Sequence, residues 1–113
     1  MKLRQYYLLK LIEECAEVSQ RAAKQMQFGA AQTQAGDGQA SESVTARPLE
    51  HFLSNKDRLS EELSDLLTTA IVLEEMGELD ADIFLSEKKQ RLKVEKIKKY
   101  LKYSQELGMV EHD

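Results

Sequence analysis

Apolar residues recur three or four positions apart near the start of the chain, a spacing that places them on one side of a helix. The positions are Leu8, Leu11, Ile12, Cys15, Ser19, Ala22 and Met26, which we call the first apolar stripe. The pattern predicts one long helix over residues 2–28. Gly29 favours its end, because glycine readily adopts the conformation that terminates helices. Cys15, the single cysteine of the chain, is expected to be a small buried residue.

A second apolar periodicity predicts a helix that begins between Pro48 and Asp57 and continues to Met76. Gly77 follows immediately and is a suitable residue to end it. The chain then continues into a third periodic stretch with no strand pattern in it. Helix is therefore the secondary structure that all three periodic stretches predict.

The third helix is expected to begin at Asp80 or Asp82, since aspartate caps helix N-termini well, and to continue to Gly108. A break near Ser86 would divide this stretch and give the fourth helix of a small bundle. The fold class that follows is all-α, with three long helices, or four if this break is real, around a small core.

The segment 29–48 differs from these helices because it is rich in Gly, Ala, Gln, Ser and Thr and nearly free of large apolar side chains. Such a composition buries too little surface to order itself. It predicts a flexible insert between the first two helices, either a lid or a passive surface loop. With 113 residues, the chain is expected to form a single helical domain over residues 1–113.

The composition also argues against several classes of function. A net charge of −4 disfavours a protein that binds a nucleic-acid backbone, and no apolar run is long enough to span a membrane. The N-terminal residues contain no small-residue cleavage site, so we expect a cytoplasmic protein without nucleic-acid or membrane partners. Charge is nevertheless uneven, because residues 88–102 are strongly basic.

Two short acidic motifs carry the main chemical signal. Glu14 and Glu17 lie three residues apart in the first helix, and Glu62 and Asp65 do so in the second. This spacing puts each pair on one helix face, about 5–6 Å apart at the Cβ atoms. Two such helices placed side by side would surround a cation with oxygen atoms. The alternative is a set of surface carboxylates, which are common in any glutamate-rich chain.

A metal explains the motifs better than a structural role, because like charges at this spacing repel and partial burial raises the cost. Oxygen ligands without histidine or cysteine select hard ions, Mg²⁺ first and Mn²⁺ second. Because Mg²⁺ retains positions for water or phosphate oxygens, a phosphorylated substrate is expected.

The motifs, Glu-Glu-x-x-Glu in the first helix and EELSDLL in the second, resemble the all-α nucleoside triphosphate pyrophosphohydrolases of the MazG type. That superfamily includes all-α dUTPases and phosphoribosyl-ATP pyrophosphohydrolases. The resemblance covers residues 5–28 and 57–104, and the gap between the motifs is longer than the family usually shows. It implies Mg²⁺-dependent hydrolysis of a nucleoside triphosphate to the monophosphate and pyrophosphate.

The resemblance also suggests roles for residues outside the four carboxylates. Glu13 or Glu61 would accept a proton from the attacking water, although either could be a solvated helix residue. In similar proteins, basic residues on the helix after the second motif contact phosphates, which here suggests Lys93 and Lys96. Lys24 is a further candidate, and a solvated helix face explains these lysines equally well.

Similar enzymes also pair their subunits, and a small helical chain with exposed apolar positions would gain from doing so. We therefore expect a homodimer or homotetramer that completes the bundle. The competing interpretation is a helical interaction module without catalysis, in which acidic and basic faces form salt bridges and leucine stripes bind a partner helix.

Overall fold

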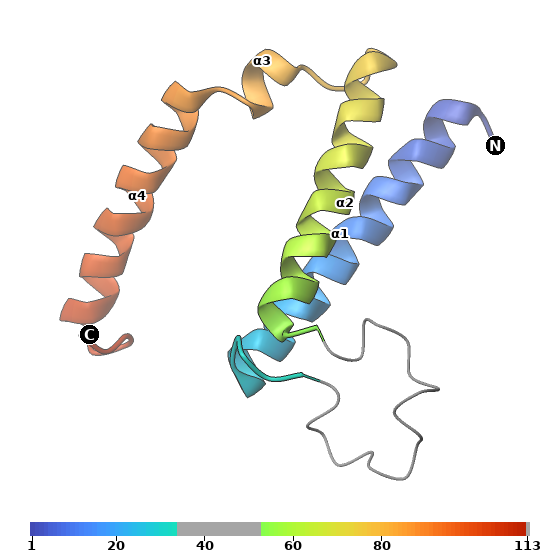
Figure 1. The fold of residues 1–113 in the computed structure, drawn as a ribbon. Coiled ribbons are helices and arrows are strands. Elements are labelled where there is room, and N and C mark those ends of the chain that lie inside the picture. Colours follow the sequence, from blue (N-terminus) through green and yellow to red (C-terminus); the bar gives the residue numbers. More distant parts are fainter. Residues whose placement is uncertain (34–52, 113) are drawn as a thin grey trace, which may run out of the picture. The chain divides into compact units, whose positions relative to one another are not determined.

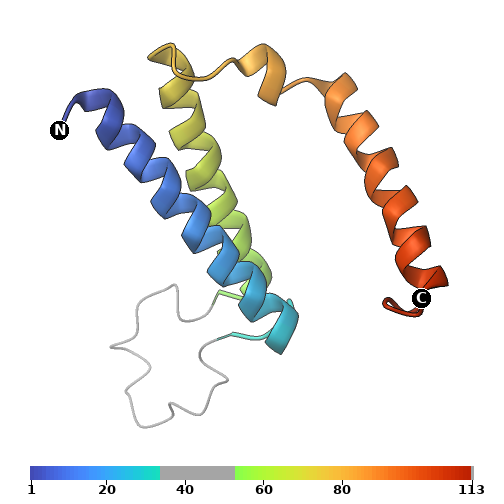
Figure 2. The ribbon, with the colours of Figure 1, turned by 180° about the vertical axis from the view of Figure 1, so that it is seen from behind.

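The computed structural model describes residues 1–33 and 53–112, which form four helices and no β-strand (Figures 1 and 2). The helices are α1 (Leu3–Phe28), α2 (Asn55–Glu75), α3 (Ala81–Phe84) and α4 (Glu87–Glu106). The predicted all-α fold class is therefore confirmed. Residues 34–48 of the predicted insert lie outside the described part of the chain.

Local sequence signals set the helix boundaries. Gly29 ends α1 with a backbone φ of +90°, a conformation that residues with a Cβ atom rarely adopt. The hydroxyl of Ser54 accepts a hydrogen bond from the Asp57 amide, and the Asp57 carboxylate accepts one from the Ser54 amide. This reciprocal capping box fixes the start of α2.

The third predicted helix is divided, and the break lies where the sequence suggested it. The Asp80 carboxylate caps α3 by accepting a hydrogen bond from the Asp82 amide. The Ser86 hydroxyl caps α4 in the same way, with the Lys89 amide as donor. A capping serine inside the periodic stretch is therefore what separates the two helices.

Residues Met1–Leu79 form one compact unit, in which α1 and α2 lie side by side as an antiparallel hairpin (Figures 1 and 2). Backbone hydrogen bonds join the end of the hairpin at which α1 ends and α2 begins. The amide of Asn55 donates to the carbonyl of Gln32 at 2.8 Å, and the amide of Lys56 donates to Ala30 at 3.0 Å. These bonds fix the start of α2 against the segment that follows α1.

The side of α1 that turns toward α2 overlaps the first apolar stripe only in part, because Leu8 and Leu11 of the stripe are partly buried and its other members are exposed. Among the described residues, Leu73 of α2 is completely buried, whereas Ile12 is 65% exposed and Met26 is 86% exposed. Cys15 is also exposed, so the prediction that it is buried was wrong. A two-helix hairpin covers one side of each helix, and in α1 that side contains partly buried residues such as Leu11 and Val18.

The second compact unit, Asp80–Asp113, contains α3 and α4. Side chains of α4 from Glu87 to Tyr103 are exposed, including both apolar and basic residues. None of the helices in the described ranges is long and apolar enough to cross a bilayer. Two units occur where one domain was predicted, and the single-domain assignment stays a prediction.

We predict that Leu73→Ala lowers the free energy of unfolding by about 2–5 kcal/mol, because it removes a fully buried side chain and leaves a cavity. Leu3→Ala is the matched control, since Leu3 is 66% exposed and should change stability by less than about 0.5 kcal/mol. Urea unfolding followed by circular dichroism measures both values. Equal effects of the two substitutions would contradict the packing described for Leu73.

Candidate metal centre

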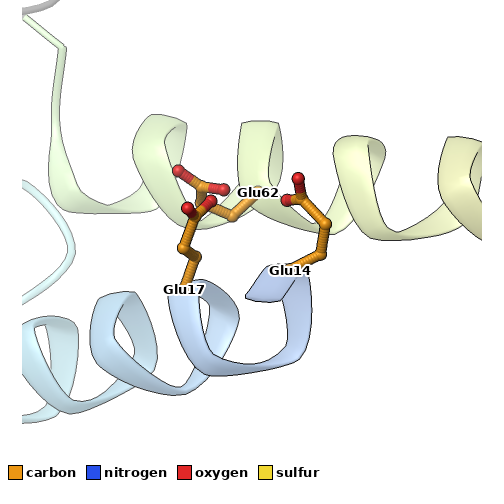
Figure 3. Close-up of side chains that lie close together, drawn as sticks. All are labelled: Glu14, Glu17 and Glu62. Carbon is orange, nitrogen blue, oxygen red and sulfur yellow. The ribbon is translucent and has the colours of Figure 1, made fainter. Parts of the chain in front are cut away.

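Carboxylates from both helices of the hairpin converge at one point. Glu14 and Glu17 of α1 and Glu62 of α2 each place one carboxylate oxygen within 4.8 Å of the others (Figure 3). Figure 3 shows the three side chains reaching into the space between the two helices. The hairpin therefore brings together three of the four residues predicted to bind metal.

The positions of these side chains follow from helix periodicity and from the pairing of the helices. Glu14 and Glu17 are three residues apart, so they lie on neighbouring turns of one face of α1. Glu62 comes from the antiparallel neighbour and is partly buried, as is Glu14, whereas Glu17 is exposed. Two of the three carboxylates thus lie at the contact between the helices.

This environment makes the carboxylates harder to ionise. Burial is the main cause that raises the pKa of Glu14 above its ordinary value, followed by the negative charges of Glu17 and Asp65. Burial also raises the pKa of Glu62, with further contributions from hydrogen bonding to Glu17 and from the neighbouring charges. Removal from water and mutual repulsion therefore act in the same direction.

Two oxygen atoms of the cluster have no protein partner. Oε2 of Glu14 and Oε2 of Glu62 are buried without a hydrogen-bond donor. A buried charged oxygen without a partner is costly, and a cation would compensate for it. Because oxygen atoms alone make up the donor set, these residues suit a hard divalent ion such as Mg²⁺.

Asp65, the fourth predicted ligand, is exposed on α2 and lies outside the group of three converging oxygens. It is close enough for its charge to raise the pKa of both Glu14 and Glu62. Its place beside the cluster is compatible with the predicted role. A rotation of this exposed side chain would be needed for it to share an ion with the other three.

The residues predicted to accept a proton are both on the surface. The carboxylate of Glu13 forms an ion pair with Lys10 at 3.0 Å, and this contact raises the pKa of Lys10. Glu61 is exposed on α2, one residue before Glu62. Neither side chain is among the three that converge.

The predicted phosphate-binding lysines lie in different parts of the chain. Lys24 is partly buried on α1, within the hairpin unit. Lys93 and Lys96 belong to α4 of the second unit and are exposed, and the ammonium group of Lys96 lies 6.0 Å from the centre of the Tyr100 ring. Their roles toward a phosphate stay predictions.

Arg58 is a charged residue that the sequence analysis did not single out. It is 7% exposed, and its Nε donates a hydrogen bond of 3.4 Å to the carbonyl of Leu53. Arg58 precedes Glu62 by four residues, so the two lie on the same face of α2. That spacing was the sequence signal that could have drawn attention to Arg58.

We predict that the metal-free protein loses stability as pH rises above the ordinary carboxyl range. The raised pKa values of Glu14 and Glu62 mean that the folded state holds protons that the unfolded state has released. Their protonation therefore stabilises the fold at low pH, and this contribution disappears as pH rises through the raised pKa values. Thermal unfolding in a chelator between about pH 5 and pH 8 measures the effect.

Glu62→Gln should flatten this pH dependence and raise the unfolding midpoint near neutral pH, because the amide carries no charge. Glu61→Gln, an exposed neighbour on the same helix, is the control and should follow the wild type. A lower midpoint for Glu62→Gln than for the wild type in chelator at neutral pH would show that the ionised carboxylate is not under strain.

Comparisons with known proteins identify no relative of this chain: no family model, no curated protein and no solved structure matches it. The candidate centre is therefore interpreted from its own residues. The observations that define it are the convergence of three carboxylates and the two buried oxygens without donors.

Proposed function

We propose that the protein hydrolyses a nucleoside triphosphate to the monophosphate and pyrophosphate in a Mg²⁺-dependent reaction. The observation that supports this most is the convergence of Glu14, Glu17 and Glu62, with buried oxygens that lack hydrogen-bond donors. A permanent cluster of this kind would destabilise the hairpin unless a cation offsets it. The motifs' resemblance to MazG-type enzymes suggests the reaction.

The chemistry of the ligands favours Mg²⁺ over softer metals. Only carboxylate oxygens are available in the cluster, and Mg²⁺ or Mn²⁺ prefers such ligands. Glu14, Glu17 and Glu62 would hold the ion, with Asp65 as a fourth ligand. When bound, the ion would neutralise phosphate charge and lower the pKa of a coordinated water.

The protein's own residues would then position the substrate and move the proton. The oxygen of water attacks the α-phosphorus, and the bond between that phosphorus and the oxygen bridging to the β-phosphate breaks. Pyrophosphate leaves, and the water proton passes to a carboxylate, for which Glu61 and Glu13 are the candidates. Glu61 is the less constrained of the two, because Glu13 is engaged by Lys10.

Lys24, Lys93 and Lys96 would supply positive charge for the triphosphate. The proposal also includes a single domain over residues 1–113 with a flexible insert at 29–48, a homodimer or homotetramer, and a cytoplasmic location. Neither a nucleic acid nor a membrane is a proposed partner.

The exposed surface of α4 favours a second candidate function. Val94, Ile97 and Leu101 are exposed apolar residues at helical spacing, and basic side chains surround them. A helical interaction module that binds an acidic partner helix would use such a surface. It would have no need of a cation at the carboxylates, and this difference can be tested.

We predict that millimolar Mg²⁺ raises the midpoint of thermal unfolding, because a ligand that binds only the native state stabilises it. At 100 times the dissociation constant, the gain in unfolding free energy is about 2.7 kcal/mol. Glu62→Gln should lose this shift, whereas Glu61→Gln should keep it. An unchanged wild-type midpoint would count against the metal centre and favour the interaction module.

We also predict release of pyrophosphate when the protein is incubated with Mg²⁺ and a panel of ribonucleoside and deoxyribonucleoside triphosphates. Glu62→Gln and Asp65→Asn should lower kcat/KM by at least about a hundredfold, because metal ligands supply several kcal/mol of transition-state stabilisation. Glu75→Gln, an exposed acidic residue at the end of α2, is the control. A specific phosphate sensor with and without added pyrophosphatase distinguishes the products.

Two results would contradict the proposal in different ways. If no nucleoside triphosphate yields pyrophosphate with the wild type, the enzymatic function fails. If orthophosphate is released directly, without added pyrophosphatase, attack does not occur at the α-phosphorus.

A further inference from the structure

One side of the α1–α2 hairpin is an uncovered apolar face. On α1 it consists of Leu8, Ile12, Cys15, Ser19, Ala22 and Met26, which we call the α1 seam. On α2 it consists of Leu63, Leu67 and Ile71, all of them exposed. In the α1 seam, Leu8 is partly buried and the other five residues are exposed.

Helix geometry places the two stripes on the same side of the hairpin. Viewed along each helix axis, the exposed stripe points roughly 100–130° away from the direction of the neighbouring helix. On both helices this rotation follows the direction in which the chain winds as residue numbers increase. Because α1 and α2 are antiparallel and both right-handed, equal rotations bring both stripes to one side. The hairpin thus has a broad apolar face of the kind that marks a protein interface.

The α1 seam has the spacing of a coiled coil. Its members follow one another at intervals of four, three, four, three and four residues, which is the heptad pattern of positions that contact a partner helix. Ala22, Ser19 and Cys15 near its centre are small, so another helix could approach closely. The pattern indicates that the occupant of this face is a helix.

The seam is also symmetric about Glu17. In an antiparallel pairing with the same seam, Leu8 would meet Met26, Ile12 would meet Ala22, and Cys15 would meet Ser19. All six positions find a partner in this single register. Such self-complementarity is the property that an isologous interface between two copies requires.

The charges of α1 favour pairing with a second copy as well. The seam contains no charged residue, and the positions that flank it on the side away from α2 are Leu9, Ala16 and Ala23. Two copies could therefore approach without like-charge repulsion, despite the net charge of −4 on each chain. A basic or acidic partner would gain no electrostatic attraction here.

We infer that the α1 seam is the interface of a homodimer, in which α1 packs antiparallel against α1 of a second copy. This inference identifies the surface for the subunit pairing included in the proposed function. The same rotation argument places Glu17 and Asp65 on the opposite side of the hairpin from the seam. Pairing through the seam would therefore leave the carboxylate cluster accessible from solvent.

The first test is the mass of the full-length chain in solution, measured by light scattering in a chelator without nucleotide. We expect a dimer for the wild type. Ile12→Glu should weaken its dissociation constant by at least about a hundredfold, because symmetry places two buried charges in the interface. Tyr6→Glu changes an exposed residue on the other side of α1 and should leave the dimer intact.

Circular dichroism of each variant at matched concentration shows whether the helices remain folded. Because Ile12 is exposed in the single chain, Ile12→Glu should keep its helical content. A wild-type monomer, or a dimer that Ile12→Glu leaves unchanged, would overturn the inference. Neither result would affect the pyrophosphate assay, which measures the proposed chemistry separately.

The second test determines the direction of pairing through disulfide formation. In the antiparallel register, Ser19→Cys places the introduced cysteine of each copy opposite Cys15 of the other copy. Two symmetric disulfides can then form, so mild oxidation should link most of the dimer covalently. Ala22→Cys would face Ile12 and should link no better than the wild type. If instead the wild type links efficiently through Cys15, the helices are parallel and the proposed antiparallel interface is wrong.

Discussion

The burial of like charges between two helices is the constraint on which the rest of this structure depends. Glu14 and Glu62 occupy positions at the α1–α2 contact that apolar side chains would fill at lower cost. Burial and mutual repulsion raise the pKa of both, and each has a buried oxygen without a donor. A hairpin that tolerates this arrangement gives up stability at the place where a cation would restore it.

The same constraint explains why few apolar side chains are buried between α1 and α2 while others are exposed on the surface of the hairpin. Carboxylates in the contact leave few positions there for apolar packing, and among the described residues Leu73 is the buried apolar side chain. Ile12, Met26, Leu63 and Leu67 are exposed instead. An apolar face for a second copy would supply the packing that the hairpin's own contact lacks. The acidic centre thus lowers the stability of the α1–α2 contact, and apolar packing on another side of the hairpin would offset that loss.

Sequence periodicity predicted the helices well because their ends depend on local chemistry. Gly29, Asp80 and Ser86 act within a few residues of their own positions, so each boundary could be derived without the fold. The prediction that Cys15 is buried was wrong because burial, unlike a helix end, does not depend on local sequence alone. Periodicity shows which residues share a face of α1, but the choice of the face that meets α2 is made by the partner helix.

The sequence likewise predicted one part of the candidate centre and not the other. Glu14 and Glu17 are placed together by helix geometry alone, so their spacing was sufficient to predict their proximity. Glu62 joins them through the register between α1 and α2, which the Asn55–Gln32 and Lys56–Ala30 bonds fix at the end of the hairpin. Sequence spacing cannot give that register, because it depends on how the connecting segment closes. The cluster is therefore a tertiary feature, and the burial that is the main cause of its raised pKa values arises only when the hairpin has formed.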